Sequence, residues 1–195
     1  YEVGNEVPVI AHIGAMDTDT SIELAKHAKD VGATAISAVT PFYYKYSADD
    51  VKQYYMDIIQ AVDIPLIIYH FPQFTGVETD IEFYRDLSKY DNIIGIKFTS
   101  KDSYFLQQII DQCGQDFLVL NGPDEVLLAN LAMGCSGAIG STYNIMPTHF
   151  INLFSEFQND NLMHARKVQF TLNRLINDML KYDFIAFIRE ILRLQ

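Results

Sequence analysis

Six short apolar segments alternate with amphipathic helical patterns along nearly the whole chain, and this alternation limits the possible folds more than any other feature. Each segment resembles a strand that is buried in a sheet. The segments recur about every 20 to 30 residues, at 7–14, 33–40, 65–70, 93–99, 117–122 and 136–141. Strands that are separated by helices pair in parallel through right-handed crossovers. The pattern therefore predicts an α/β fold with a parallel sheet.

Helical patterns follow these strands at 21–31, from 47 onward, and at 80–88, 103–113, 124–133 and 147–195. Ser47 is a typical N-cap, and the acidic residues after it favour the first turn of a helix. Aromatic and aliphatic residues at helical spacing, such as Tyr54, Tyr55 and Ile58, are typical of core packing rather than of a cofactor pocket. No low-complexity linker interrupts the alternation, so we expect a single domain over residues 1–195.

Two architectures fit this alternation, an open doubly wound sheet and part of an eight-stranded (β/α)8 barrel. Polar or unusual clusters directly follow the strands, at Pro41–Tyr44, Tyr69–Pro72, Lys97–Ser100, Asn121–Glu125 and Gly140–Asn144. A barrel brings all such strand ends to one mouth, whereas an open sheet uses only the crevice at its switch point. The chain has no G-x-G-x-x-G and no P-loop, which leaves nucleotide binding unsupported. A barrel is favoured, although six strands are too few to complete one.

The charge balance excludes several classes of partner. The 195 residues include 14 Lys and Arg against 25 Asp and Glu, a formal net charge of -11, and no basic run. This argues against nucleic acid and against an anionic membrane surface, and the apolar runs are too short to span a bilayer. Cys113 and Cys135 lack a metal-ligand spacing, and no H-E-x-x-H occurs. We expect a cytoplasmic protein that needs no metal and binds small molecules.

Lys97 lies in the apolar stretch 93–99, where an ammonium group is unexpected. Desolvation at such a position favours the neutral amine, which is a nucleophile. Tyr69 ends the preceding strand, so the two side chains are expected to meet, and a phenol can relay protons while an amine forms an imine with a carbonyl substrate. The alternative is structural: Lys97 extends to water and Tyr69 is an ordinary tyrosine at a strand end.

Six motifs together resemble the dihydrodipicolinate synthase/N-acetylneuraminate lyase family of class I pyruvate-dependent aldolases. The motifs are Ala11–Gly14, Thr40–Tyr44, Tyr69–Pro72 with Thr75–Gly76, Gly95–Lys97, Asn121–Glu125 and Gly140–Asn144. Their order and spacing extend the resemblance over nearly all of the chain. It implies a (β/α)8 TIM barrel, Lys97 as the Schiff-base residue, Tyr69 as the proton-transfer residue and Tyr43 as a further member of the relay. It also implies a homotetramer that uses no cofactor.

One position separates the branches of this family. The synthase branch carries an arginine in a P-x-R-T-G pattern after the tyrosine strand, whereas Phe74 stands there in this chain. The resemblance to the lyase branch implies cleavage of N-acetylneuraminate, a sialic acid, to pyruvate and N-acetylmannosamine. The residues that would contact the hydroxylated sugar are Thr99, Gly122, Asp124, Glu125 and Ser141. Asp124 and Glu125 can equally be the acidic first turn of a helix.

A further motif of the family is missing from the sequence. Relatives carry a G-S-T-G-E-like or G-T-T-G-E-like loop after their second strand, which holds the pyruvate carboxylate, and residues 1–195 contain none. We therefore expect an incomplete barrel that lacks its first two βα repeats and the end of its C-terminal helical region. Two other functions stay open: another aldolase of the family, such as a dihydrodipicolinate synthase or a 2-keto-3-deoxy sugar acid aldolase, and a non-catalytic binding or assembly module.

Overall fold

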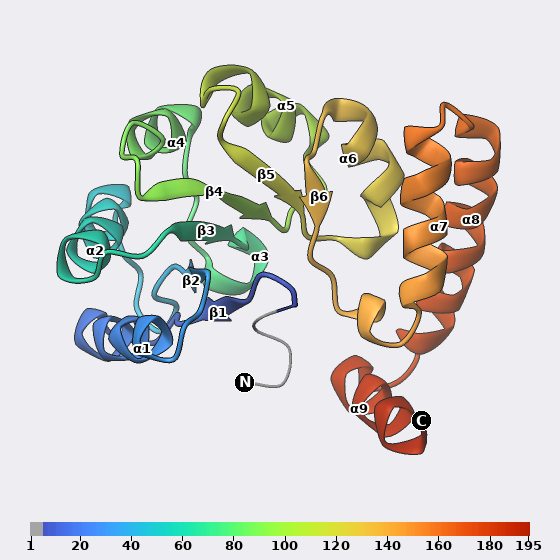
Figure 1. Cartoon of the computed structure of the whole chain (residues 1–195), viewed down its shortest axis with the longest axis horizontal. Helices are drawn as coiled ribbons and strands as arrows, with labels where there is room; N and C mark the ends of the chain where they lie inside the picture. The colour runs from blue at the N-terminus through green and yellow to red at the C-terminus, as the bar shows by residue number, and fades with distance from the viewer. Residues whose placement is uncertain (1–5) are drawn as a thin grey trace. The chain divides into compact units, whose positions relative to one another are not determined.

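The computed structural model describes residues 6–195, which divide into two compact units at the bond between Leu120 and Asn121 (Figure 1). Unit 1 holds the described residues up to Leu120, and unit 2 holds residues 121–195. Within residues 6–195, no helix combines the length and the apolar character that crossing a bilayer requires. The expected single domain over residues 1–195 stays a prediction, and the two units are described separately.

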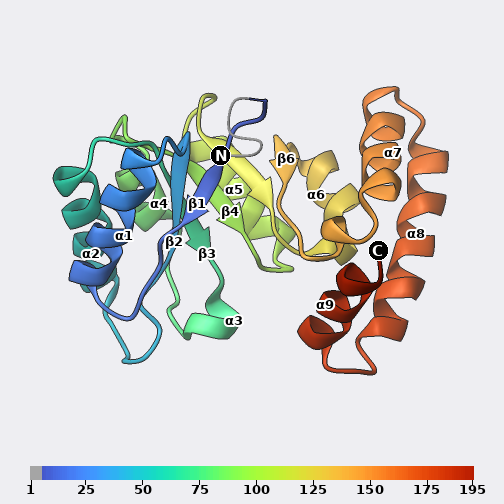
Figure 2. The ribbon, with the colours of Figure 1, turned by 60° about the horizontal axis from the view of Figure 1, so that its bottom comes forward.

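The sheet of unit 1 follows the order of the chain. Its strands are β1 (Ile10–His12), β2 (Ala35–Val39), β3 (Leu66–His70), β4 (Ile93–Phe98) and β5 (Leu118–Asn121), of which the last residue belongs to unit 2. The ladders β1–β2, β2–β3 and β3–β4 are parallel, as predicted. Figure 2 shows these strands side by side. The β3–β4 register places Tyr69 opposite Lys97 and Ile68 opposite Ile96.

The helices of unit 1 cover one face of this sheet. They are α1 (Thr18–Asp30), α2 (Ala48–Ala61), α4 (Ile81–Leu87) and α5 (Ser103–Gln112), and a short α3 (Pro72–Thr75) follows β3. In Figure 1, α1, α2, α4 and α5 lie along the outer side of the strands. Ser47 forms a capping box with Asp50, which confirms the expected N-cap of α2. Side chains alternate along a strand, so Ile68 and Ile96, both fully buried, face away from Tyr69 and Lys97.

Gly95 allows β4 and β5 to approach closely. A Cβ atom on Gly95 would lie 2.3 Å from the Leu118 carbonyl oxygen. No ordinary side chain fits in this space, so glycine is required by contact with a neighbouring strand rather than by an unusual dihedral angle. The close packing holds β4, and with it Lys97, against the next strand.

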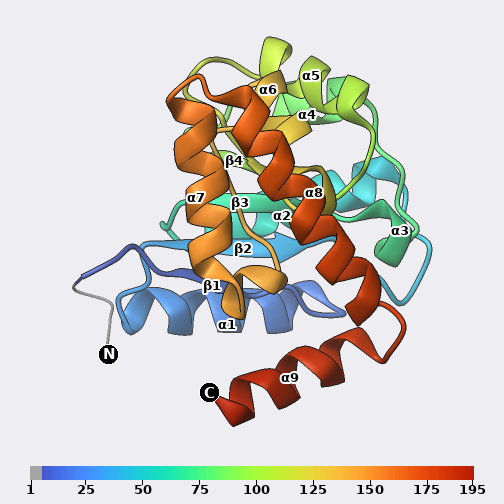
Figure 3. The ribbon, with the colours of Figure 1, turned by 90° about the vertical axis from the view of Figure 1, so that its right-hand side faces the viewer.

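Unit 2 is mostly helical. After Asn121 it contains a 3-10 turn η1 (Asp124–Val126), α6 (Leu127–Met133), β6 (Gly137–Ala138), a second turn η2 (Thr142–Asn144), α7 (Pro147–Gln158), α8 (Leu162–Met179) and α9 (Phe184–Leu194). The Ile139 amide donates to the Asn121 carbonyl at 2.9 Å, which connects the segment after β6 to the end of β5. Figure 3 shows α7 and α8 packed side by side.

The alternation predicted from the sequence is confirmed, but several boundaries differ. The sixth strand is two residues long instead of extending over 136–141. The helical pattern of 147–195 divides into three helices, with breaks at 159–161, where Asp160 has φ 59, and at 180–183, where Asp183 caps α9. The helix expected at 124–133 begins as a 3-10 turn, and α3 was not expected at all.

Candidate active site

Tyr69 and Lys97 lie at the carboxyl ends of β3 and β4, where the sequence predicted that they would meet. The Lys97 Nζ atom lies 4.0 Å from the centroid of the Tyr69 ring. A cation at this distance from an aromatic face is attracted by the ring quadrupole. The free protein therefore keeps the amine directly over the phenol ring, on the side of the sheet opposite to the helices.

Two more rings hold Tyr69 in place. Phe71 stacks on it with ring centroids 5.8 Å apart and an interplanar angle of 9°, and His12 meets it edge-on at 5.8 Å. Desolvation and the nearby charge of Lys97 lower the pKa of His12, so the neutral imidazole is favoured. The sequence did not predict His12 in this cluster. Its place in the Ala11–Gly14 motif, at the end of the first strand, was the signal that could have indicated it.

Thr99 and Thr40 add hydroxyl groups to unit 1. The Thr99 amide donates to the His70 carbonyl at 2.8 Å. The side-chain oxygens of Thr99 and Thr40 are buried and have no hydrogen-bond partner among the described residues. A buried hydroxyl without a partner costs about 1–3 kcal/mol, and a ligand that pairs with it recovers part of that cost. Tyr43 lies in the loop after β2, is 69% exposed, and packs its ring against Tyr44 at 4.8 Å.

In unit 2, Asp124 is buried and held by Thr142. Its Oδ2 accepts hydrogen bonds from the Thr142 amide at 2.8 Å and from the Thr142 hydroxyl at 2.6 Å. Gly140 lies against the same carboxylate, because a Cβ atom there would be 1.7 Å from Asp124 Oδ1. Ser141 is exposed, and its carbonyl accepts from Asn144 at 3.0 Å. Three of the residues expected to contact the sugar, Gly122, Asp124 and Glu125, lie in one turn of the chain, residues 122–125, at the start of η1.

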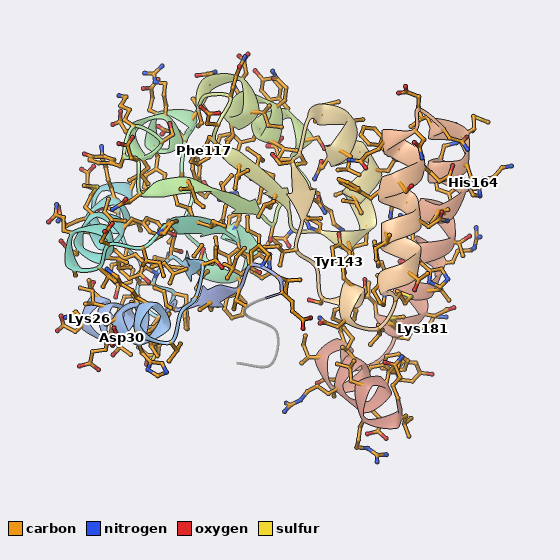
Figure 4. The ribbon with its side chains drawn as sticks, in the orientation of Figure 1. Lys26, Asp30, Phe117, Tyr143, His164 and Lys181 are labelled. Atoms are coloured by element: carbon orange, nitrogen blue, oxygen red, sulfur yellow. The ribbon has the colours of Figure 1, made fainter. Side chains whose placement is uncertain are left out.

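Tyr143, labelled in Figure 4, lies in η2 beside α7. Its ring centroid is 4.0 Å from that of Phe150. Burial, and next the charge of Asp124, raise the pKa of the Tyr143 hydroxyl, so the phenol stays neutral at physiological pH. The residue therefore packs against α7 as a neutral ring next to the loop that carries Ser141.

The chemistry of the two units differs. Unit 1 offers a primary amine, which can form an imine with a carbonyl compound, next to a phenol, which can transfer protons. Unit 2 offers carboxylates and hydrogen-bonding groups on short turns, which suit a hydroxylated ligand. Over residues 6–195, no three His, Cys, Asp or Glu side chains gather in a way that could hold a metal ion.

Relatives of known function match the whole chain. The family model described as "Dihydrodipicolinate synthetase family" matches residues 1–195. N-acetylneuraminate lyases of Clostridium perfringens strains 13 and SM101 are each 40% identical over 194 residues, which cover 100% of this chain and 67% of the relative. The shared length includes Tyr69, Lys97 and every other residue of the candidate site.

Solved structures agree with this result. The chain resembles the structure of CdNal from Clostridium difficile in complex with mannosamine, with a TM-score of 0.89 and 39% identity over 92% of this chain and 62% of that chain. It also resembles the wild-type sialic acid aldolase of Ruminococcus gnavus, with a TM-score of 0.88 and 32% identity over 92% of this chain and 60% of that one. The chain thus spans less than two thirds of these solved relatives. The incomplete TIM barrel that the sequence predicted is confirmed by these likenesses, and the chain belongs to the dihydrodipicolinate synthetase family.

Proposed function

We propose that this protein is a lyase that cleaves N-acetylneuraminate to pyruvate and N-acetylmannosamine through an imine on Lys97. The observation that carries the proposal is the position of the Lys97 Nζ atom, 4.0 Å from the centroid of the Tyr69 ring, in a chain that is 40% identical to curated N-acetylneuraminate lyases. An amine at a strand end, next to a phenol, suits a carbonyl substrate that must gain and lose protons as the imine forms.

The proposed reaction has four steps. The Lys97 amine attacks the keto carbon of the open-chain sugar acid, water leaves, and a protonated imine forms. The hydroxyl group two carbons away loses its proton, the carbon–carbon bond breaks, and N-acetylmannosamine leaves as an aldehyde. The bonding electrons remain on the pyruvate part as an enamine, which is then protonated. Hydrolysis releases pyruvate and restores the amine. Tyr69 is the proposed donor and acceptor for these protons, and Tyr43 is the proposed second tyrosine of the relay.

The hydroxylated part of the substrate needs other partners. We assign its binding to Thr99, Gly122, Asp124, Glu125 and Ser141. The buried Thr99 hydroxyl without a partner supports this assignment in unit 1, and the tightly held turn of Asp124 supports it in unit 2. A site that is built to hydrogen-bond a hydroxyl discriminates strongly against substrates without that group.

Reduction with borohydride tests the imine directly. Borohydride added with pyruvate should attach a stable adduct to Lys97, which peptide mass spectrometry locates, and the Lys97→Ala variant should give none. Lys101→Ala is the matched control, because it removes a neighbouring lysine that is exposed and should leave the adduct unchanged. An unmodified Lys97 in folded wild-type protein contradicts the proposal.

A related aldolase is the second candidate, and Phe74 bears on it. Phe74 occupies the place of the arginine that marks the synthase branch, which argues against a dicarboxylate product and leaves a 2-keto-3-deoxy sugar acid as the competing substrate. Cleavage rates measured on N-acetylneuraminate and on such sugar acids separate the two. If the chain cleaves neither keto acid, the result favours the third candidate function, a non-catalytic binding or assembly module.

The location, assembly and partners of the protein are also proposals, supported by its family and its charge. We expect a cytoplasmic homotetramer that uses no metal or organic cofactor and binds neither nucleic acid nor membranes. The net charge of -11 and the lack of a basic run argue against binding to nucleic acid and to anionic membrane surfaces. Sedimentation of the chain as a monomer contradicts the tetramer.

A further inference from the structure

Two side-chain amides of α8 hold the backbone of the η1 turn. Gln169 Nε2 donates to the Asp124 carbonyl at 3.2 Å, and Asn173 Nδ2 donates to the Glu125 carbonyl at 2.9 Å. Gln169 and Asn173 are four residues apart in the helix and therefore lie on the same face. Two consecutive carbonyls of the proposed substrate-binding turn are thus fixed by one face of one helix.

The two amides also fix each other. Gln169 Nε2 donates to Asn173 Oδ1 at 2.8 Å, and Gln169 Oε1 accepts from the Leu128 amide at 3.0 Å. Because the Leu128 amide can only donate, it determines which end of the Gln169 side chain is the oxygen. Gln169 is 5% exposed, so water does not compete for these bonds. The pair is a closed network rather than two independent contacts.

The turn is held from its other side by η2. Thr142 donates twice to the Asp124 carboxylate, and Asp124 Oδ1 occupies the space that a side chain at Gly140 would need. The backbone of the turn therefore depends on α8, and the Asp124 side chain depends on η2. If the α8 bonds are removed, the Asp124 side chain stays held while the Glu125 carbonyl is released.

We propose that Gln169 and Asn173 are positioning residues that set where the 122–125 turn presents its groups to the hydroxylated amino sugar. This inference rests on the proposed function and concerns only the sugar part of the substrate, since both amides belong to unit 2 and Lys97 belongs to unit 1. A misplacement of about 1 Å can cost a factor of about 10² at a site that depends on geometry.

The test compares two asparagines of α8. Asn173→Asp keeps the shape of the side chain and the oxygen that accepts from Gln169, but it removes the donor to the Glu125 carbonyl. Asn177→Asp, one turn further along and exposed, makes the same change in charge and is the control. Asn173→Ala removes the donor without adding charge. For the full chain and each variant, we would measure the Kd for N-acetylmannosamine by NMR titration without pyruvate, so that the reverse of the proposed reaction cannot consume the sugar. In a separate experiment without the sugar, we would measure the rate at which borohydride traps pyruvate on Lys97.

Both Asn173 variants are expected to weaken sugar binding about tenfold or more, the loss that one to two hydrogen bonds predict, while pyruvate trapping proceeds at the wild-type rate. Asn177→Asp should match the wild type in both measurements. The inference is overturned if the Asn173 variants bind the sugar as the wild type does, if they lose trapping to the same extent as binding, or if the wild type does not bind the sugar. Absence of trapping in a wild-type protein that binds the sugar contradicts the proposed function instead.

Discussion

Tyr69 and Lys97 are register partners on adjacent parallel strands, and the Lys97 Nζ atom lies over the face of the Tyr69 ring, 4.0 Å from its centroid. In the reaction that we propose, the ring and the hydroxyl of Tyr69 therefore act separately. The ring attracts the ammonium form of the lysine, whereas only the hydroxyl can exchange protons with a substrate. A substitution that removes the hydroxyl and keeps the ring distinguishes the two.

Tyr69→Phe should slow the formation of the pyruvate imine by about 10² or more, the usual contribution of a positioned acid–base group. The Phe ring still stacks on Phe71 and still lies under Lys97, so the fold should be unchanged. Intact mass spectrometry after timed borohydride quenching gives the rate. Tyr104→Phe is the control, because Tyr104 is 71% exposed. If Tyr69→Phe forms the adduct as fast as the control, the hydroxyl is not the relay.

The order of strands and helices along the chain was predictable from the sequence because each strand is a local apolar run. The five residues of β2, for example, are all buried, and burial on both faces produces an apolar segment that is visible without any knowledge of distant contacts. The meeting of Tyr69 and Lys97 followed from the same logic. Consecutive strands in a βαβ fold are neighbours, so residues at their carboxyl ends come together.

Other features depend on contacts between residues distant in sequence and could not be predicted. Asn173 and Glu125 are 48 residues apart, and neither has a local pattern that indicates the other. The breaks between α7, α8 and α9 are also weakly encoded, because Asp160 adopts its left-handed conformation within a continuous amphipathic pattern. The position of His12 at the edge of Tyr69 required the register between strands, which the sequence does not specify.

His70 should make the stability of the protein depend on pH. The residue is 6% exposed, its Nδ1 lies 2.7 Å from the Tyr84 hydroxyl, and its ring stacks on Phe98. Burial lowers the pKa of His70 to about 4, although the charge of Asp102 acts in the opposite direction. The folded-state pKa thus lies below the unfolded value of 6.5, so the unfolded chain takes up the proton first.

The contribution of neutral His70 to the free energy of unfolding is therefore present above pH 6.5. It is lost as the pH falls from 6.5 towards 4, and it does not change further below pH 4. The loss between pH 7 and pH 5 is about 2 kcal/mol. Urea unfolding at the two pH values measures it. His70→Asn should flatten this dependence, whereas His149→Gln, at an exposed histidine, should retain it. An unchanged pH dependence in His70→Asn means that another group is responsible.

Gly95→Ala should destabilise unit 1 strongly. The new methyl group would lie 2.3 Å from the Leu118 carbonyl oxygen, and this atom belongs to the backbone of β5 and cannot rotate away. Overpacking of this kind costs about 3 kcal/mol. Gly32→Ala is a useful comparison, because its Cβ would meet nothing within 4 Å and only its left-handed φ of 84 opposes it, at about 1 kcal/mol. Urea unfolding gives the free energy of unfolding of both variants. A smaller loss for Gly95→Ala than for Gly32→Ala contradicts the steric explanation.

Asn121 and Asn130 should depend on each other energetically. Both are fully buried; Asn130 Nδ2 donates to Asn121 Oδ1 at 2.7 Å, and Asn121 Nδ2 donates to the Pro123 carbonyl at 2.9 Å. Asn130→Ala leaves the Asn121 oxygen buried without this donor, which costs about 2 kcal/mol. Asn159→Ala, at an exposed asparagine, should cost far less.

A double-mutant cycle tests whether the two asparagines act as one unit. Once Asn121 is alanine, the hydrogen bond from Asn130 Nδ2 to Asn121 Oδ1 is already gone, so Asn130→Ala should cost less in that background than in the wild type. We expect a coupling energy of about 1 kcal/mol or more from urea unfolding of the two single variants and the double variant. Strictly additive losses would mean that each side chain is held by other neighbours. The Pro123 carbonyl, in the turn for which we propose a role in substrate binding, would then be fixed independently of α6.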